Sequence, residues 1–272
     1  MKLPFIVALL ALVVTGCATA PATDPATSTA LDSILAGDHR LAENRARDPY
    51  RHPKQTLEFF GIRQDMTVVE VWPGAGWYTE ILAPLLRDRG KLYAASLDPA
   101  SGEYAKSTVD SYRQKLDMRP DLYGKVTVTT LAAPPAKNDI APAGSADLVL
   151  SFRNLHGWMM FGWEKEAIAA MHTALKPGGV LGVVGHRGNP NTPQDPKAAS
   201  GYVNEDHAIR MIEAAGFKLV ARAEINANPK DTKDYEKGVW TLPPGYADGK
   251  QARYASIGES DRFTLKFVKT GK

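Results

Sequence analysis

Short apolar runs alternate along the chain with segments whose apolar residues recur every three or four positions. The runs predict seven strands, at residues 67–72, 91–97, 125–131, 146–152, 180–185, 217–225 and 262–268. The periodic segments predict the helices between them, among them 77–87, 103–116, 164–175 and 206–215. Strands alternating with helices predict a doubly wound α/β fold, with a mostly parallel seven-stranded sheet and helices on both faces. Ligands bind such a sheet at the carboxyl ends of its strands.

The first 30 residues have a different pattern. Lys2 precedes an apolar run, residues 3–14, that is too short to span a bilayer, and Thr15 and Gly16 then precede Cys17. The order of residues 14–17 resembles the lipobox of bacterial lipoproteins. The resemblance implies that residues 1–16 are a signal peptide and that Cys17 is lipidated on its thiol and its new amino group. The alternatives are an ordinary signal peptide with a chance cysteine and a buried amino-terminal helix.

After this cysteine, residues 17–30 are rich in alanine, proline, threonine and serine, which predicts a flexible tether. Residues 31–272 are then predicted to form a single domain. A lipoprotein of this kind is expected in the bacterial cell envelope, anchored in the outer membrane and facing the periplasm, with the lipid anchor as its one contact with the membrane.

Composition limits the choice of partners and cofactors. The 272 residues are 44% hydrophobic and 23% charged, which is ordinary for a globular protein. The net charge is +3 and the basic residues are scattered, so the sequence favours no nucleic-acid partner. Cys17 is the single cysteine, which excludes disulfides within the chain, and the six histidines lack the spacing of metal ligands.

The stretch "VVEVWPGAGWYTEILAPLL" reads as a strand, a glycine-containing loop and a helix. Gly74 and Gly76 allow a sharp turn and close approach of a ligand to the backbone. A dinucleotide loop requires a third glycine where Thr79 stands, and residues 71–85 contain no lysine or arginine for a phosphate. S-adenosylmethionine suits the loop better, because it has no phosphate and Glu70 offers a carboxylate to its ammonium. The alternative is a glycine turn that merely joins strand to helix.

Four segments together resemble the class I S-adenosylmethionine-dependent methyltransferases. "VVEVWPGAGWYTEIL" is similar to their motif I, "GKLYAASLD" to their second strand, "GSADLVLSFRNLH" to their fourth and "ALKPGGVLGVV" to the turn before their fifth. Other segments resemble an exported bacterial group of predicted methyltransferases. The resemblance implies a Rossmann-like fold, S-adenosylmethionine as cofactor and a set of cofactor-binding residues. The set comprises Glu70, Gly74, Gly76, Tyr78, Thr79 and Asp98.

Two positions depart from the family pattern. Trp72 stands where the first motif glycine is expected, and the acid that holds the ribose hydroxyls should lie near Ser96, whereas the nearest is Asp98. Either a bulge brings Asp98 to the ribose, or ribose recognition is weakened. A branched side chain at Gly76 is expected to enter the adenosyl site.

The segment "SFRNLHGW", which follows the fourth strand, contains the candidate catalytic residues. His156 matches a histidine that serves as general base in some small-molecule O-methyltransferases, and an imidazole of near-neutral pKa suits that role. Arg153 and Asn154 are similar to residues of quinone-biosynthesis C-methyltransferases. The alternative is that His156 caps the next helix or binds a backbone carbonyl.

The long connection at residues 226–261 contains four aromatic residues and either covers the pocket or packs on the sheet edge. The sequence thus favours methyl transfer from S-adenosylmethionine to a small hydroxylated or aromatic acceptor. The alternative is a ligand-binding or envelope-interaction module that keeps the fold without the reaction.

Overall fold

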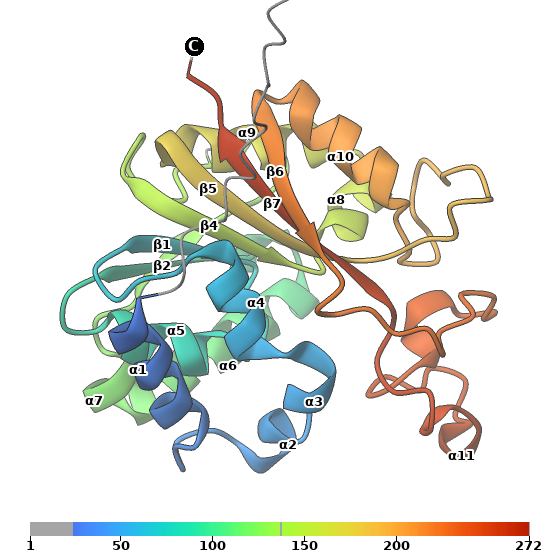
Figure 1. Cartoon of the computed structure of the whole chain (residues 1–272), viewed down its shortest axis with the longest axis horizontal. Coiled ribbons are helices and arrows are strands. Elements are labelled where there is room, and N and C mark those ends of the chain that lie inside the picture. Colours follow the sequence, from blue (N-terminus) through green and yellow to red (C-terminus); the bar gives the residue numbers. More distant parts are fainter. Residues whose placement is uncertain (1–23, 137, 272) are drawn as a thin grey trace, which may run out of the picture.

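A seven-stranded sheet runs through the computed structural model, which describes residues 24–136 and 138–271 (Figure 1). Its strands, in chain order, are β1 (Thr67–Val71), β2 (Lys91–Ser96), β3 (Thr127–Thr130), β4 (Ala146–Phe152), β5 (Leu175–His186), β6 (Phe217–Ala223) and β7 (Arg262–Lys269). Their order in the sheet is β3-β2-β1-β4-β5-β7-β6. Strands β1 to β5 pair in parallel, and β7 is antiparallel to both of its neighbours. The predicted doubly wound, mostly parallel sheet is confirmed.

Helices cover both faces of the sheet. The helices on one face are α1 (Pro25–Leu35), α4 (Pro53–Phe60), α5 (Thr79–Leu86), α6 (Glu103–Met118) and α7 (Pro120–Tyr123). Those on the other face are α8 (Leu155–Phe161), α9 (Glu164–Ala174) and α10 (Glu205–Ala214). The short elements are α2 (Ala42–Arg45), α3 (Asp48–Arg51), η1 (Pro99–Ser101), η2 (Gly238–Thr241) and α11 (Gln251–Tyr254). Within the described residues, no helix has the length and hydropathy needed to cross a bilayer.

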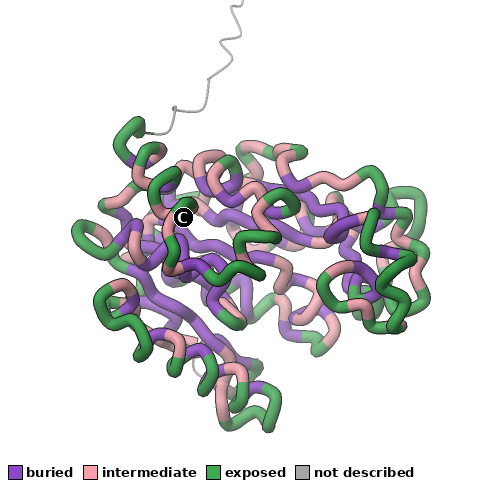
Figure 2. Tube along the Cα trace, turned by 90° about the horizontal axis from the view of Figure 1, so that it is seen from below, coloured by how far each residue is buried: buried purple, intermediate pink, exposed green. Residues whose placement is uncertain are grey.

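The two faces of β1 contribute to two separate cores. Val69 and Val71 pack under α8 and α9, whereas Val68 packs under α4 and α5, because successive side chains of a strand point to opposite faces. Figure 2 shows that the segments running through the middle of the molecule are buried and that the peripheral turns are exposed. Fully burying a valine side chain contributes roughly 1.5–3 kcal/mol, so burial of valines on both faces stabilises β1 in the interior of the sheet.

Helical structure begins before residue 31, the start of the domain predicted from the sequence. Helix α1 begins at Pro25, because the Asp24 carboxylate accepts hydrogen bonds from the N–H groups of Ala26 (3.4 Å) and Thr27 (3.2 Å). Leu31 is fully buried in the core beside α4 and α5. The predicted tether is therefore too long at its carboxyl end. Its remainder, with Cys17 and the predicted signal peptide, lies outside the described residues.

Candidate functional site

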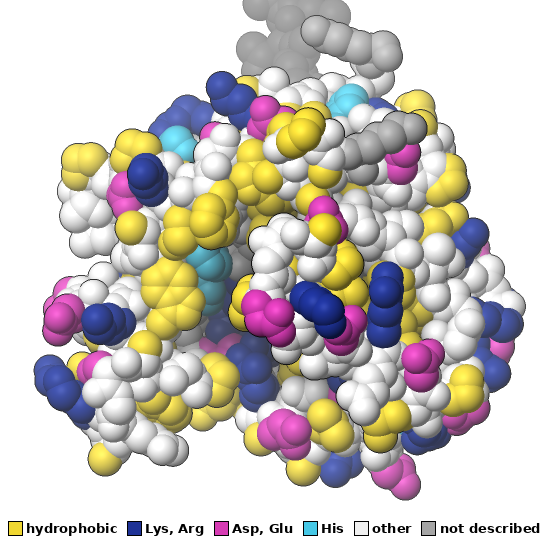
Figure 3. Space-filling view, turned by 180° about the vertical axis from the view of Figure 1, so that it is seen from behind, with side chains coloured by type: hydrophobic (Ala, Val, Ile, Leu, Met, Phe, Trp, Pro, Cys, Tyr) yellow, Lys and Arg dark blue, Asp and Glu magenta, His cyan; other side chains and the backbone are white. Residues whose placement is uncertain are grey.

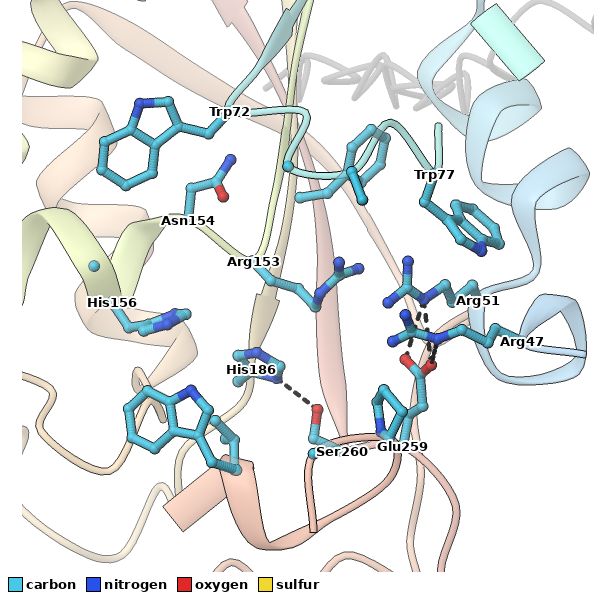
Figure 4. A pocket seen from close by; sticks show the side chains of 18 of the residues that line it. Arg47, Arg51, Trp72, Trp77, Arg153, Asn154, His156, His186, Glu259 and Ser260 are labelled. Carbon is cyan, nitrogen blue, oxygen red and sulfur yellow. Dashed lines mark hydrogen bonds and ion pairs between the residues drawn. The ribbon is translucent and has the colours of Figure 1, made fainter. Parts of the chain in front are cut away.

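A pocket of about 650 Å³ lies at the carboxyl ends of β1, β2, β4 and β5. Since β1 and β4 are adjacent while their connections run to opposite sides of the sheet, the pocket is at the topological switch point of the fold. The surface is hollowed here, and basic, acidic and histidine side chains are visible inside the hollow (Figure 3). The side chains drawn in Figure 4 come from these strand ends, from the segment around α3 and from residues 239–260.

The two glycines of the motif I loop have different surroundings. Gly74 lines the pocket at φ +58°, and a Cβ built on it would meet no atom within 4 Å. Gly76, at φ +77°, faces the core instead, because a built Cβ would lie 3.0 Å from the ring of Tyr112. A branched side chain at Gly76 would thus disturb helix packing rather than enter a ligand site, which corrects the expectation for this position.

Glu70 and Thr79 also lie outside the pocket lining, contrary to the cofactor-binding roles expected for them. Glu70 follows Val68 on the same face of β1, so its carboxylate lies under the start of α5 and accepts a hydrogen bond from Thr79 Oγ1 (2.6 Å). The Thr79 hydroxyl also contacts the Tyr112 hydroxyl (3.1 Å). Burial raises the pKa of Glu70 to about 7, although the hydrogen bond from Thr79 opposes this rise. These residues form a buried network between the strand and two helices.

Tyr78 and Asp98 occupy structural positions as well. The Tyr78 ring stacks on Phe152 at a centroid distance of 3.5 Å, and only 4% of the residue is exposed. Asp98 Oδ1 accepts the N–H of Ala100 (2.9 Å) and caps η1. The pocket wall at the end of β2 is formed by Ser96 and Leu97 instead. No bulge brings the Asp98 carboxylate into the pocket, so the expected ribose contact is not formed there.

Trp72, the residue at the first glycine position of the motif, forms one wall of the pocket. Its φ of +48° is unusual for a bulky residue and directs the chain into the loop. The indole Nε1–H donates to the carbonyl of Leu131 just after β3 (2.9 Å). The ring packs against Trp158 and Trp163, with centroids 5.6 and 5.5 Å away. The indole therefore covers the end of β3, and no described residue of that strand lines the pocket.

The predicted catalytic segment does line the pocket. Arg153, Asn154 and His156 all face it from the end of β4 and the start of α8 (Figure 4). Asn154 Nδ2 donates to the carbonyl of Val71 (2.7 Å), which joins the ends of β4 and β1. The His156 side chain forms no hydrogen bond with any residue that the structure describes, and its ring lies near those of His186 and Trp240. It does not cap the helix, since the α8 amino terminus has no side-chain cap.

Both histidines of the pocket are held in the neutral form. Burial, followed by the charge of Arg153, lowers the pKa of His156 to about 4. Burial, followed by His156, lowers the pKa of His186 well below its ordinary value. His186 Nδ1 lies 2.5 Å from the Ser260 hydroxyl. The near-neutral pKa expected for His156 is thus wrong, and its imidazole is a weaker base than a solvated one.

A cluster of charged residues closes the pocket on the side of α3. Glu259 accepts hydrogen bonds from Arg47 (2.5 Å), Arg51 (3.1 Å) and Arg262. Burial alone would raise the pKa of Glu259, but the charges of Arg262 and Arg51 outweigh it and hold the pKa far below its ordinary range. The Arg51 guanidinium also lies 4.6 Å from the centroid of the Trp77 ring.

This cluster was not predicted from the sequence. Its members come from residues 47–51 and from residues 259–262, more than 200 positions apart, so no local spacing could have revealed it. The nearest signal was the connection at residues 226–261, which was expected either to cover the pocket or to pack on the sheet edge. Residues 239–240, 242–245 and 259–260 line the pocket, which confirms the first alternative for these parts. Among the described residues, no group of three or more histidine, cysteine, aspartate or glutamate side chains could hold a metal ion.

Comparisons with known proteins agree with the fold. A methyltransferase from Aquifex aeolicus described as S-adenosylmethionine-dependent is 17% identical, with a TM-score of 0.55, over 91% of this chain and 99% of that chain. The cyclase SpnF is 16% identical, with a TM-score of 0.58, over 87% of this chain and 86% of that chain. A putative sarcosine dimethylglycine methyltransferase from Galdieria sulphuraria is 11% identical, with a TM-score of 0.52, over 84% and 88%.

These similarities show the class I methyltransferase fold. In sequence, no protein-family model and no curated protein matches the chain. Because one of the similar structures is described as a cyclase, the reaction has to be inferred from the site itself.

Proposed function

We propose that the protein binds S-adenosylmethionine in this pocket and transfers its methyl group to a small hydroxylated or aromatic acceptor. The observation that carries the proposal is the position of the pocket, which lies against Gly74 at the switch point between β1 and β4. At about 650 Å³ the pocket has the size usual for small-molecule sites, roughly 300–1,000 Å³.

The residues at the strand ends suit part of this cofactor. Gly74 leaves space for close approach to the loop, and Ser96 and Leu97 form the wall at the end of β2. Bound S-adenosylmethionine would supply an electrophilic methyl group, whose in-line displacement depends mainly on positioning. Arg153 and Asn154 would lie beside the reacting groups, because they leave the end of β4 next to the Gly74 loop.

The other half of the pocket suits an acceptor. His156 and Trp240 form its wall, with ring centroids 5.9 Å apart, and Trp240 is 40% exposed. An aromatic acceptor would pack on these rings. The neutral imidazole of His156 would accept a proton from an acceptor hydroxyl, and its low pKa makes this contribution modest.

We also propose that Cys17 carries a lipid anchor that holds the protein in the cell envelope, facing the periplasm. The support is the order of the amino-terminal residues: a short basic start, an apolar run, two small residues and the one cysteine of the chain. Several acyl chains would give stable attachment, whereas a single one is marginal.

A second function, ligand binding without methyl transfer, is favoured by the position of Trp72. Its indole fills the space at the end of β3, while neither Glu70 nor Asp98 lines the pocket. The described residues that line the pocket therefore offer no carboxylate for the ribose hydroxyls, since Glu259 is already bound by three arginines.

Calorimetric titration with S-adenosylmethionine tests the proposal. We expect measurable binding to the wild type and its loss in Gly74→Leu, because the leucine side chain would enter the pocket. Gly178→Leu is the matched control: Gly178 also has a left-handed φ (+74°) and open space around a built Cβ, but it does not line the pocket. No heat of binding to the wild type, or equal affinity in all three proteins, would contradict the proposal.

A further inference from the structure

The charged side chains that line the pocket are predominantly positive. Four of them are the guanidinium groups of Arg47, Arg51, Arg153 and Arg262, and Glu259 is the one carboxylate among the described lining residues. Four positive charges against one negative charge leave an excess of three. Since the two histidines of the pocket are neutral, they do not alter this balance.

Glu259 binds the three other arginines of the pocket and forms no hydrogen bond or ion pair with Arg153. Its Oε1 accepts from Arg47 (2.5 Å), and its Oε2 accepts from Arg51 (3.1 Å) and from Arg262. The guanidinium of Arg153, by contrast, forms no hydrogen bond and no ion pair with any residue in the described part of the chain. The backbone N–H of Arg153 is satisfied by the carbonyl of Val184 (2.6 Å), so only its side chain lacks a partner.

The backbone holds this cation inside the pocket. Arg153 has a φ of +63°, a left-handed conformation that is strained for a non-glycine residue. Its side chain extends across the pocket toward Arg51 (Figure 4). Burial, followed by the charge of Arg262, lowers the pKa of Arg153 to about 10, so the group still carries its charge at neutral pH. The Arg153 side chain is only partly exposed, and a partly desolvated charge that lacks an ion-pair partner is unfavourable for folding, which points to a ligand that supplies the opposite charge.

We propose that Arg153 anchors an anion-binding subsite, in which a carboxylate or phosphate group of the ligand accepts hydrogen bonds from its guanidinium. The planar fork of an arginine suits two-point contact with either group. The excess positive charge of Arg47, Arg51 and Arg262 attracts the anion to the same end of the pocket. The subsite specifies the ligand class of the pocket and rests on the proposed function for its location.

The anionic group can come from two sources. One is the amino acid carboxylate of S-adenosylmethionine, and the other is an acidic group on the acceptor. Decarboxylated S-adenosylmethionine separates them, because it keeps the sulfonium and the adenosyl group but lacks the carboxylate. Inorganic phosphate serves as the probe for an acidic acceptor group.

The experiment compares binding of these three probes to the wild type, Arg153→Gln and Arg153→Lys. We expect Arg153→Gln to weaken binding of at least one anionic probe by roughly 10- to 100-fold, the effect of losing a hydrogen bond to a charged group. Arg153→Lys should bind more tightly than Arg153→Gln but less tightly than the wild type, since lysine keeps the positive charge but not the two parallel N–H donors of the guanidinium. Arg210→Gln is the control, because Arg210 is an exposed arginine of α10 outside the pocket.

The pattern of losses identifies the source. Loss for S-adenosylmethionine, with decarboxylated S-adenosylmethionine unaffected, assigns the subsite to the cofactor carboxylate. Loss for phosphate alone assigns it to the acceptor. If phosphate binding depends on Arg153 while S-adenosylmethionine does not bind even to the wild type, the subsite stands and the proposed methyl transfer fails. Unchanged affinity for every probe in Arg153→Gln overturns the subsite.

Thermal unfolding without ligand gives a second readout. Replacing an arginine with a structural role would destabilise the protein, whereas removing a partly buried cation that has no ion-pair partner should leave the unfolding midpoint unchanged or raise it. A fall of several degrees in Arg153→Gln relative to Arg210→Gln would contradict the inference, including in the case where the variant fails to fold.

Discussion

The pH dependence of stability tests whether the Glu70 carboxyl in β1 is a buried structural group or a ligand of the cofactor. Its carboxyl is buried under α5 and bonded to Thr79, and burial raises its pKa from 4.5 to about 7. The folded protein therefore holds this proton up to about pH 7, whereas the unfolded chain releases it near 4.5. The stabilisation from the protonated group is complete below pH 4.5 and is lost as the pH rises through 7. At about 1.36 kcal/mol per pH unit, this loss amounts to about 3 kcal/mol.

Glu70→Gln isolates this effect, because glutamine has nearly the same shape and does not titrate. We expect the free energy of unfolding of the wild type, relative to this variant, to fall by about 3 kcal/mol between pH 4.5 and pH 8. Urea unfolding followed by tryptophan fluorescence at several pH values measures the difference. Since both proteins share every other titrating group, those contributions cancel.

If the free energy of unfolding changed with pH by the same amount in the wild type and in Glu70→Gln, the reasoning would be refuted. A second check concerns the ligand. If Glu70 bound the cofactor ammonium, saturating S-adenosylmethionine would lower the pKa of Glu70 and abolish the pH-dependent difference. We expect the difference to persist in the presence of the ligand, because the carboxylate lies outside the pocket lining.

Three further substitutions test other parts of the account. Gly76→Val should lower the free energy of unfolding by about 2–4 kcal/mol, because it strains a left-handed position and crowds Tyr112, and wild-type stability in urea would contradict this. His156→Ala should lower methyl transfer by roughly 10²-fold, the lower end for a positioned base, at nearly unchanged S-adenosylmethionine affinity. The wild-type rate should stay flat from pH 5 to 8, because a pKa of about 4 keeps the imidazole unprotonated there, and a titration near pH 6.5 would argue against this environment. Cys17→Ser should release the protein from the membrane fraction or leave it unprocessed, and unchanged fractionation would exclude the lipid anchor.

The architecture was predictable because it depends on local patterns. The β-branched run of β1 and the periodic apolar residues of α5 identify their elements directly, and Pro53 and Gly61 mark both ends of α4. The pocket is also where the strand–loop–helix pattern places it. The amino-terminal boundary was missed because one capping residue, Asp24, starts a helix within a segment of low-complexity composition.

The orientation of single side chains was harder to predict. Glu70 falls on the core face of β1 by the two-residue alternation of a strand, and the motif resemblance obscured this simple consequence. The Glu259 cluster joins segments from both ends of the chain, and the unpartnered state of Arg153 depends on that cluster. Such features depend on the tertiary structure and are not marked by any recognisable local spacing of residues in the sequence.

Transfer of a labelled methyl group tests the central claim most directly. The protein is incubated with methyl-labelled S-adenosylmethionine and a low-molecular-weight extract of the cells that produce it, with Gly74→Leu as the blocked control and Gly178→Leu as the matched one. The account predicts a labelled product with the wild type and Gly178→Leu, and none with Gly74→Leu. S-adenosylmethionine that binds to the wild type without any transfer of label would contradict methyl transfer and leave a binding module with the same fold.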